Sequence, residues 1–187
     1  SALTIAAAGA NYQAGTLSAT GGTGSGFTGT YGISATTSSY SISGTNTTCQ
    51  AGNLLVNGVS KGAYTVHFKV ASISLGGTNQ NADASDGSDT GTGTFTLGGG
   101  TGGTFTVNSG VISNIQISST AYFASAPAVA ASGSTSFGDN TLTAVLASTG
   151  QLQAISVSDT TKYASTPTVT SSSSFGNATV AAVLNNS

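Results

Sequence analysis

Three aspartates, Asp83, Asp86 and Asp89, form the only acidic cluster of the sequence and lie in a segment rich in Gly, Asn and Ser. Carboxylate oxygens on a flexible loop are ligands that Ca²⁺ prefers. Their spacing matches neither the EF-hand loop nor the nonapeptide calcium repeat. The alternative is a solvated loop whose charges provide solubility. We assign no metal or cofactor site, and the sequence leaves calcium binding by these three residues open.

The single histidine and the single cysteine offer little further chemistry. His67 could join a serine and an aspartate in a triad, but no Gly-x-Ser-x-Gly elbow is apparent in a strand-turn-helix context. It lies beside Lys69 on the polar face of an alternating segment, which indicates an exposed or interface strand residue. One His and one Cys cannot complete a tetrahedral zinc site. Cys49 cannot form an intrachain disulfide and is expected to be a small, half-buried apolar residue.

Two glycine runs, residues 24–29 and 98–103, match Gly-x-Gly-x-x-Gly. A dinucleotide site also requires a following helix and an acid about 20 residues further on. Strands rich in Thr and aromatic residues are expected instead, so we expect no nucleotide binding. A glycosidase would need paired carboxylates, and the only acids outside the loop are Asp139 and Asp159. The sequence therefore predicts no enzyme and no catalytic residue.

Six tyrosines could form a surface on which a carbohydrate stacks, although aromatic residues in small β-modules more often pack in the core and at turns. The equivalent placement of Phe123 and Tyr163, described below, favours packing. The six are Tyr12, Tyr31, Tyr40, Tyr64, Tyr122 and Tyr163.

The composition predicts an all-β protein without nucleic-acid or membrane partners. The chain is 37% hydrophobic and only 4% charged, unlike disordered chains, so it can bury a core. Thr, Val, Ile, Tyr and Phe favour strands. Three lysines and no arginine cannot neutralise many phosphates. A transmembrane helix needs an apolar run of about 18 residues, and the sequence contains none. A net charge of −2 in a chain so poor in charge favours association.

Apolar alternation and turn residues predict where the strands lie. Residues 64–70 place Tyr and Val side chains on one face and polar side chains on the other, and a bulge is expected before Ile73. Asn57-Gly58 predicts a type I′ turn. The segment 76–93 predicts an exposed polar loop. Further strands are expected at 54–56, 94–97, 104–107, 112–117, 128–131 and 142–146.

The last part of the chain contains the same β-module twice. Residues 110–117 correspond to 150–157, and residues 123–129 correspond to 163–169, both at an offset of 40; Phe137-Gly138-Asp139-Asn140 corresponds to Phe175-Gly176-Asn177-Ala178 at an offset of 38. Pro127 and Pro167 occupy the same position, where an edge strand is expected to begin.

These patterns predict small β-sandwich or β-barrel-like modules in two lobes. Residues 1–108 are expected to form an N-terminal lobe that carries the loop 76–93. Residues 109–187 are expected to form a C-terminal lobe of two repeated modules, 110–147 and 150–187.

Parts of the sequence resemble a glycine-rich β repeat found in structural proteins of tailed bacteriophages. Residues 9–15 and 21–24 resemble its first half, which residues 99–103 repeat loosely; residues 110–129 and 150–169 resemble its second half. The Gly-x-Gly before the aromatic residue of that repeat is missing in both copies, and residues 34–92 match no part of it.

The resemblance implies a structural role in the virion. Such repeats occur in tail fibres, tail-spike heads and capsid decoration proteins, and the compact length favours a capsid decoration (cement) protein on the particle surface. Its expected partners are the major capsid protein or other virion proteins, contacted through the N-terminal strand and β edges. A homo-oligomer, for which a trimer is one arrangement, is expected. The alternative is a tail-fibre or adhesin module that binds a host-surface glycan.

Overall fold

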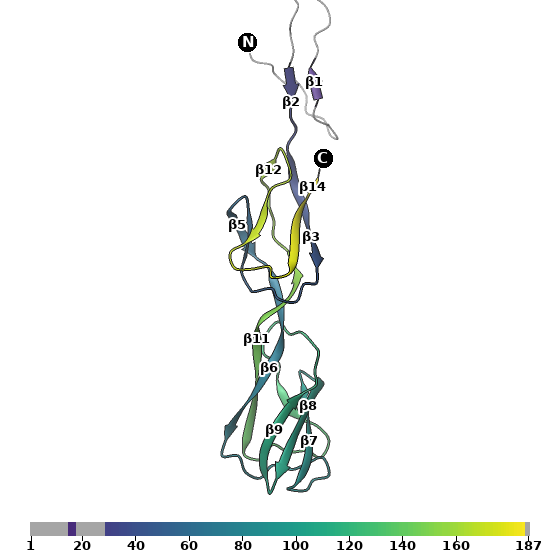
Figure 1. Cartoon of the computed structure of the whole chain (residues 1–187), viewed down its shortest axis with the longest axis vertical. Coiled ribbons are helices and arrows are strands. Elements are labelled where there is room, and N and C mark those ends of the chain that lie inside the picture. The colour runs from purple at the N-terminus through teal and green to yellow at the C-terminus, as the bar shows by residue number, and fades with distance from the viewer. Residues whose placement is uncertain (1–14, 18–28, 186–187) are drawn as a thin grey trace, which may run out of the picture.

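The computed structural model describes residues 15–17 and 29–185, and every regular element in them is a β-strand, which confirms the all-β prediction (Figure 1). The strands are β1 (Gly15–Leu17), β2 (Gly29–Tyr31), β3 (Ala35–Gly44), β4 (Asn53–Val56), β5 (Val59–Ala63), β6 (Thr65–Gly77), β7 (Gly91–Leu97), β8 (Gly100–Asn108), β9 (Val111–Ile117), β10 (Val129–Ala131), β11 (Asn140–Ala154), β12 (Lys162–Tyr163), β13 (Val169–Ser171) and β14 (Ala178–Asn185).

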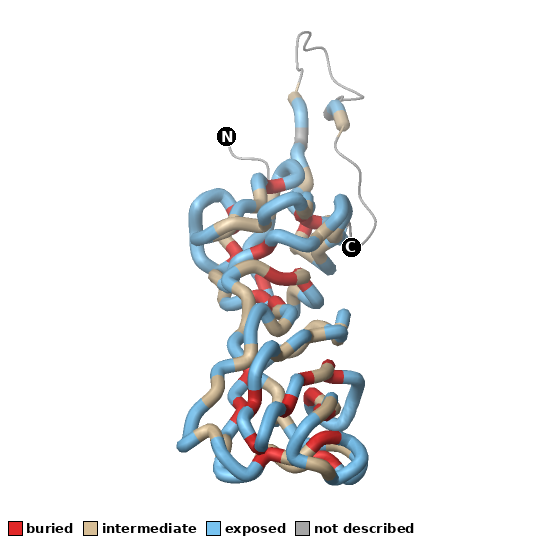
Figure 2. Tube along the Cα trace, turned by 60° about the horizontal axis from the view of Figure 1, so that its bottom comes forward, coloured by how far each residue is buried: buried red, intermediate tan, exposed pale blue. Residues whose placement is uncertain are grey.

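Two long antiparallel strands, β6 and β11, run through the waist of the molecule and join two lobes (Figure 1). We call residues 35–68 and 150–185 the host lobe, and residues 70–146 the inserted lobe, because the second interrupts the first in the chain. The buried residues gather within the two lobes (Figure 2). Each lobe has its own apolar core.

The two cores are built from separate sets of residues. In the inserted lobe the buried cluster consists of Ala82, Phe95, Leu97, Phe105, Val107, Ile112, Leu142 and Ala144. In the host lobe it consists of Cys49, Leu54, Val56, Tyr64, Val66, Leu152 and Val180. Neither list shares a residue with the other, so each lobe buries its own apolar surface.

The two lobes share the register of their first hairpins and most of their strand pairing. Leu54 pairs with Gly62 in β4–β5, and Phe95 pairs with Gly103 in β7–β8; in both hairpins a bulge follows immediately. The same register aligns the two cores. The corresponding pairs are Cys49 with Ala82, Leu54 with Phe95, Val56 with Leu97, Tyr64 with Phe105, Val66 with Val107, Leu152 with Ile112, and Val180 with Leu142.

An asparagine in the left-handed conformation locks each lobe in the same way. The Nδ2 of Asn46 donates to the Leu152 carbonyl (2.7 Å), and its Oδ1 accepts from the Leu152 N–H (2.9 Å). Asn79 makes the same two bonds to the main chain of Ile112, at 3.0 and 2.8 Å. Both asparagines have positive φ, 51° and 55°, which Asn tolerates better than most residues.

The chain therefore contains one β-lobe nested inside a copy of itself. The chain runs through the first half of the host lobe (residues 35–68) and then through the first half (70–108) and the second half (110–146) of the inserted lobe. It ends with the second half of the host lobe (150–185). This grouping differs from a division at residues 108/109. The module 110–147 packs with β7 and β8, whereas 150–185 packs with β3 and β4. Strand pairing across long sequence distances decides the grouping, and β11 carries the end of one module and the start of the next as one strand.

Several local predictions are confirmed. Asn57 and Gly58 both have positive φ between β4 and β5, as a type I′ turn requires. The expected bulge lies at Ala71, which is skipped between the pairs Val70–Leu146 and Ser72–Val145. The strands β10 and β13, which follow the two prolines, lie at sheet edges. The predicted loop 76–93 is too long, because residues 76–77 belong to β6 and residues 91–93 to β7; most of its residues are exposed, but Ala82, Ala84 and Gly93 are buried.

Candidate functional site

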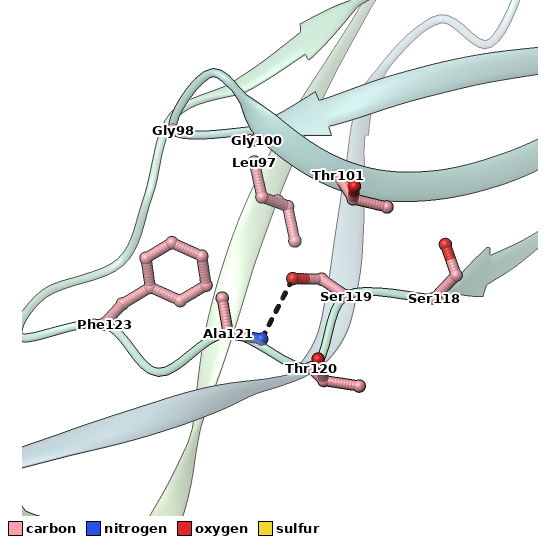
Figure 3. A pocket seen from close by; sticks show the side chains of 9 residues that line it. All are labelled: Leu97, Gly98, Gly100, Thr101, Ser118, Ser119, Thr120, Ala121 and Phe123. Carbon is pink, nitrogen blue, oxygen red and sulfur yellow. Dashed lines mark hydrogen bonds between the residues drawn. The ribbon is translucent and has the colours of Figure 1, made fainter.

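A surface hollow of about 500 Å³ lies in the inserted lobe, between the β7–β8 turn and the loop that follows β9 (Figure 3). It is lined by one aromatic ring, one leucine, several hydroxyl groups and turn glycines, without a charged side chain. The lining residues are Leu97, Gly98, Gly100, Thr101, Ser118, Ser119, Thr120, Ala121 and Phe123.

Main-chain hydrogen bonds hold the walls of the hollow in place. The N–H groups of Ser118 and Ser119 both donate to the Gly102 carbonyl, at 2.9 and 3.0 Å. The Ala121 N–H donates to the Ser119 hydroxyl at 3.3 Å (Figure 3). Phe123 exchanges two N–H···O bonds of 2.8 Å with Phe68 at the waist. The hollow is thus formed by fixed backbone, which can offer hydroxyl groups beside an aromatic ring to a neutral polar ligand.

The host lobe has a charged cluster at the corresponding place. Lys61 Nζ lies 2.8 Å from the Asp159 carboxylate, and the Tyr163 hydroxyl donates to the same carboxylate at 2.7 Å. The Thr161 N–H donates to Asp159 Oδ1 at 3.0 Å, as the Ala121 N–H does to Ser119. In the shared register, Asp159 corresponds to Ser119, Tyr163 corresponds to Phe123, and Lys61 corresponds to Gly102.

The ion pair is held in a mostly buried setting. The Asp159 side chain is 1% exposed and that of Lys61 is 14% exposed. Burial raises the pKa of the Asp159 carboxyl, but hydrogen bonds from Lys61, Tyr163 and Thr161 outweigh it and hold that pKa well below its ordinary value. The hydrogen bond to Asp159 also raises the pKa of Lys61. Burial, followed by the Asp159 charge, raises the pKa of the neighbouring Tyr40. Both charges of the pair are therefore present at neutral pH.

Acid is expected to weaken the host lobe through Asp159. Because the folded-state pKa of this carboxyl is lowered, its stabilising contribution is complete above the ordinary carboxyl pKa of about 4 and is lost as pH falls through the folded pKa. Asp159→Asn should therefore lower stability at pH 7 and reduce the loss of stability between pH 5 and pH 2, measured by urea denaturation. Asp89→Asn, which removes an exposed carboxylate, is the control. An unchanged pH profile in Asp159→Asn would contradict this role.

The three aspartates of the predicted acidic cluster are not brought together as a ligand set. Asp83 forms a backbone bridge with Ser136. Asp86 accepts hydrogen bonds from the Ser88 hydroxyl (2.7 Å) and N–H (3.0 Å), which lower its pKa, the hydroxyl having the larger effect. Across the described ranges 15–17 and 29–185, no three His, Cys, Asp or Glu side chains gather as they would around a metal ion. Along the loop 83–90, Asp86 and Asp89 are exposed and Asp83 is half-buried.

The remaining candidate residues have packing roles where they are described. Cys49 is fully buried, more than expected, and its Sγ donates to the Phe175 carbonyl at 2.9 Å. His67 is half-buried on β6 opposite Gln151. Phe123 and Tyr163 pack against the two cores at equivalent positions, as predicted.

The other tyrosines and the glycine runs can be placed only in part. Tyr64 is buried and donates to the Gln50 carbonyl at 2.6 Å, and the Tyr122 ring lies 5.2 Å from Lys69 Nζ. The run 98–103 forms the β7–β8 turn and leads into a strand. Tyr12 and residues 24–28 of the other glycine run lie outside the described residues.

Comparison of the chain with protein-family models, with curated proteins and with solved structures finds no match. Within the part of the chain that the structure describes, no helix of the length and apolarity needed to cross a membrane occurs.

The sequence prediction missed both the hollow and the ion pair. The alignment of the two modules already shows this difference in sequence, because Ser119 of the first module aligns with Asp159 of the second. The lysine that completes the pair lies about 100 residues earlier in the sequence, so only the strand register identifies it.

Proposed function

We propose that the chain is a structural virion protein of a tailed phage, a decoration or cement protein that binds the capsid shell and stabilises it. Its partner is the major capsid protein or another virion protein. The mechanism is passive: a protein that binds the assembled shell but not its separated subunits stabilises the shell by mass action. Exposed strand edges and exposed apolar residues such as Val59 (59% exposed) provide contact surface.

The observation that carries this proposal is what the nested duplication repeats. Core positions, turn glycines and the locking asparagines recur in both lobes. The charged cluster of the host lobe, Lys61 with Asp159 and Tyr163, has Gly102, Ser119 and Phe123 at the corresponding positions of the other lobe. The repeat thus reproduces shape rather than a reactive site, which favours a scaffold over an enzyme. The resemblance to phage β repeats supplies the virion context.

A second candidate function rests on the hollow of the inserted lobe. Hydroxyl groups of Thr101, Ser118, Ser119 and Thr120 beside the Phe123 ring form the kind of surface on which a sugar can stack and form hydrogen bonds (Figure 3). This candidate is a tail-fibre or adhesin module that binds a host-surface glycan.

Copy number and binding preference separate the two functions. We expect the protein at hundreds of copies per particle, measured by gel densitometry against the major coat protein, because decoration sites repeat across a shell. The purified chain should bind capsids stripped of it. A few copies per particle, or binding to host envelope with none to capsids, would overturn the decoration role. Loss of envelope binding in Phe123→Ala, with Val111→Ala as a surface control, would then assign it to the hollow.

A further inference from the structure

The short hairpin β1–β2 has the same register as the first-half hairpins of both lobes. Gly15 pairs with Tyr31 and Leu17 pairs with Gly29. In β7–β8, Gly93 pairs with Phe105 and Phe95 pairs with Gly103. The residue types correspond as well, since Gly29-Thr30-Tyr31 matches Gly103-Thr104-Phe105.

The host lobe gives the same alignment. Leu54 pairs with Gly62, and the Tyr64 N–H donates to the Gly52 carbonyl at 3.2 Å. The segments Gly15-Thr16-Leu17, Gly52-Asn53-Leu54 and Gly93-Thr94-Phe95 therefore occupy one position in three hairpins. We infer that β1–β2 belongs to the first half of a third copy of the lobe.

In both complete lobes a strand from the second half pairs beside this hairpin, along the hairpin's second strand in the inserted lobe and directly after it in the host lobe. In the inserted lobe, Phe105 of β8 pairs with Ile115 of β9, and Gly103 pairs with Ile117. In the host lobe, β6 pairs with the end of β11, Val66 opposite Leu152. Each covering strand brings a buried residue to the core, Ile112 at 3% exposure and Leu152 at 2%. Among the described residues, β2 pairs with β1 alone.

Both second halves of the chain are already used. Residues 110–146 complete the inserted lobe, and residues 150–185 complete the host lobe. An open strand edge is a template for another strand, in which main-chain hydrogen bonds provide affinity and alternating side chains provide specificity.

We propose that the β2 edge binds a strand from a segment outside residues 1–187 that has the second-half pattern. In that pattern apolar residues stand two, five and seven positions after a glycine. Examples are Gly110-Val111-Ile112-Ser113-Asn114-Ile115-Gln116-Ile117 and Gly150-Gln151-Leu152-Gln153-Ala154-Ile155-Ser156-Val157. The site is thus a receptor for a complementing β-strand. It stands on the hairpin register and does not depend on the role in a virion.

The backbone geometry identifies the amide that should bond to the incoming strand. Tyr31 corresponds to Tyr64, whose N–H points to the first strand of its own hairpin. Consecutive amides of a strand point to opposite sides, so the N–H of Thr30 faces the open edge. Thr30→Pro removes this donor without removing a bond between β1 and β2. Thr30→Val keeps the donor and is the matched control.

A peptide with the sequence of residues 150–185 is the probe, because it carries the second-half pattern. A labelled copy is titrated into the full 187-residue chain and followed by fluorescence anisotropy. We expect saturable binding that weakens about ten-fold or more in Thr30→Pro and is retained in Thr30→Val, ten-fold corresponding to about 1.4 kcal/mol. A control peptide with serine in place of Leu152, Ile155 and Val157 should also bind at least about ten-fold more weakly.

Amide hydrogen exchange then locates the bound peptide. Protection should increase at residues 29–31 and stay unchanged at residues 65–66, which the host lobe's own second half already covers. Equal binding of the two peptides, or equal binding by the two Thr30 variants, would overturn the proposal. Changes at residues 65–66 instead would show exchange into the host lobe, and would overturn it as well.

Discussion

Phe105→Ala is expected to lower the free energy of unfolding of the inserted lobe by about 3–5 kcal/mol. The Phe105 side chain is 1% exposed, and its ring lies 5.5 Å from that of Phe137. A Cβ on Gly93 would come within 2.3 Å of the Phe105 ring, so the ring packs directly on the backbone of β7. Removing the ring leaves a cavity between two strands whose paired backbones cannot collapse into it.

The measurement is urea denaturation followed by circular dichroism, with amide hydrogen exchange to separate the two lobes. Loss of protection should be concentrated in β7, β8 and β9. Val111→Ala is the control, because Val111 lies on neighbouring β9 at 41% exposure and should cost well under about 1 kcal/mol. A loss spread equally over both lobes would contradict the separation of the two cores.

Local structure could be predicted from the sequence because local signals determine it. Alternation in residues 64–70 defines a strand whichever partner it has, and Asn57-Gly58 favours a type I′ turn on its own. The repeat of residues 110–147 in 150–187 was visible because the aligned residues are of the same types. These signals establish the all-β class and most of the strands.

The nested arrangement could not be predicted, because the first halves diverge and are separated in the chain. Their hairpins share only a glycine and two apolar residues per strand, as in Gly52, Leu54 and Val56 of one and Gly93, Phe95 and Leu97 of the other. The aspartate-containing loop lies between Ala82 and β7 in the inserted lobe. It makes the first half of the inserted lobe longer than the first half of the host lobe, which contains Cys49. The two second halves are similar in sequence, so their residues do not indicate which lobe each one completes. The lobe is determined by whether the second half pairs with β4 or with β7.

The segment 34–92, which matched no known pattern, contains the first half of the host lobe and the start of the inserted one. The same difficulty applies to the candidate site. At the corresponding place the inserted lobe has a hollow and the host lobe has an ion pair. The difference depends on Gly102 in the first and Lys61 in the second, and these two residues align only because each lies at the bulge of its hairpin.

Gly138→Ala and Gly176→Ala are each expected to cost about 3 kcal/mol or more, from a strained backbone and a backbone clash together. Both glycines have φ of +59°. A Cβ on Gly138 would lie 2.2 Å from the Asn81 carbonyl, and a Cβ on Gly176 would lie 2.2 Å from the Thr48 carbonyl. Neither carbonyl can withdraw easily, because the adjacent residues Ala82 and Cys49 are fully buried.

Gly133→Ala separates the two contributions. Gly133 has φ of +67° but nothing within 4 Å of the position of a Cβ, so alanine there should cost only the left-handed backbone, about 1 kcal/mol. Urea denaturation with amide exchange should place the loss from Gly138→Ala in the inserted lobe and that from Gly176→Ala in the host lobe. Equal costs for all three variants would mean that the close approach is relieved without strain. Matching costs for Gly138 and Gly176 would show that the two lobes share the turn energetics as well as the strand register.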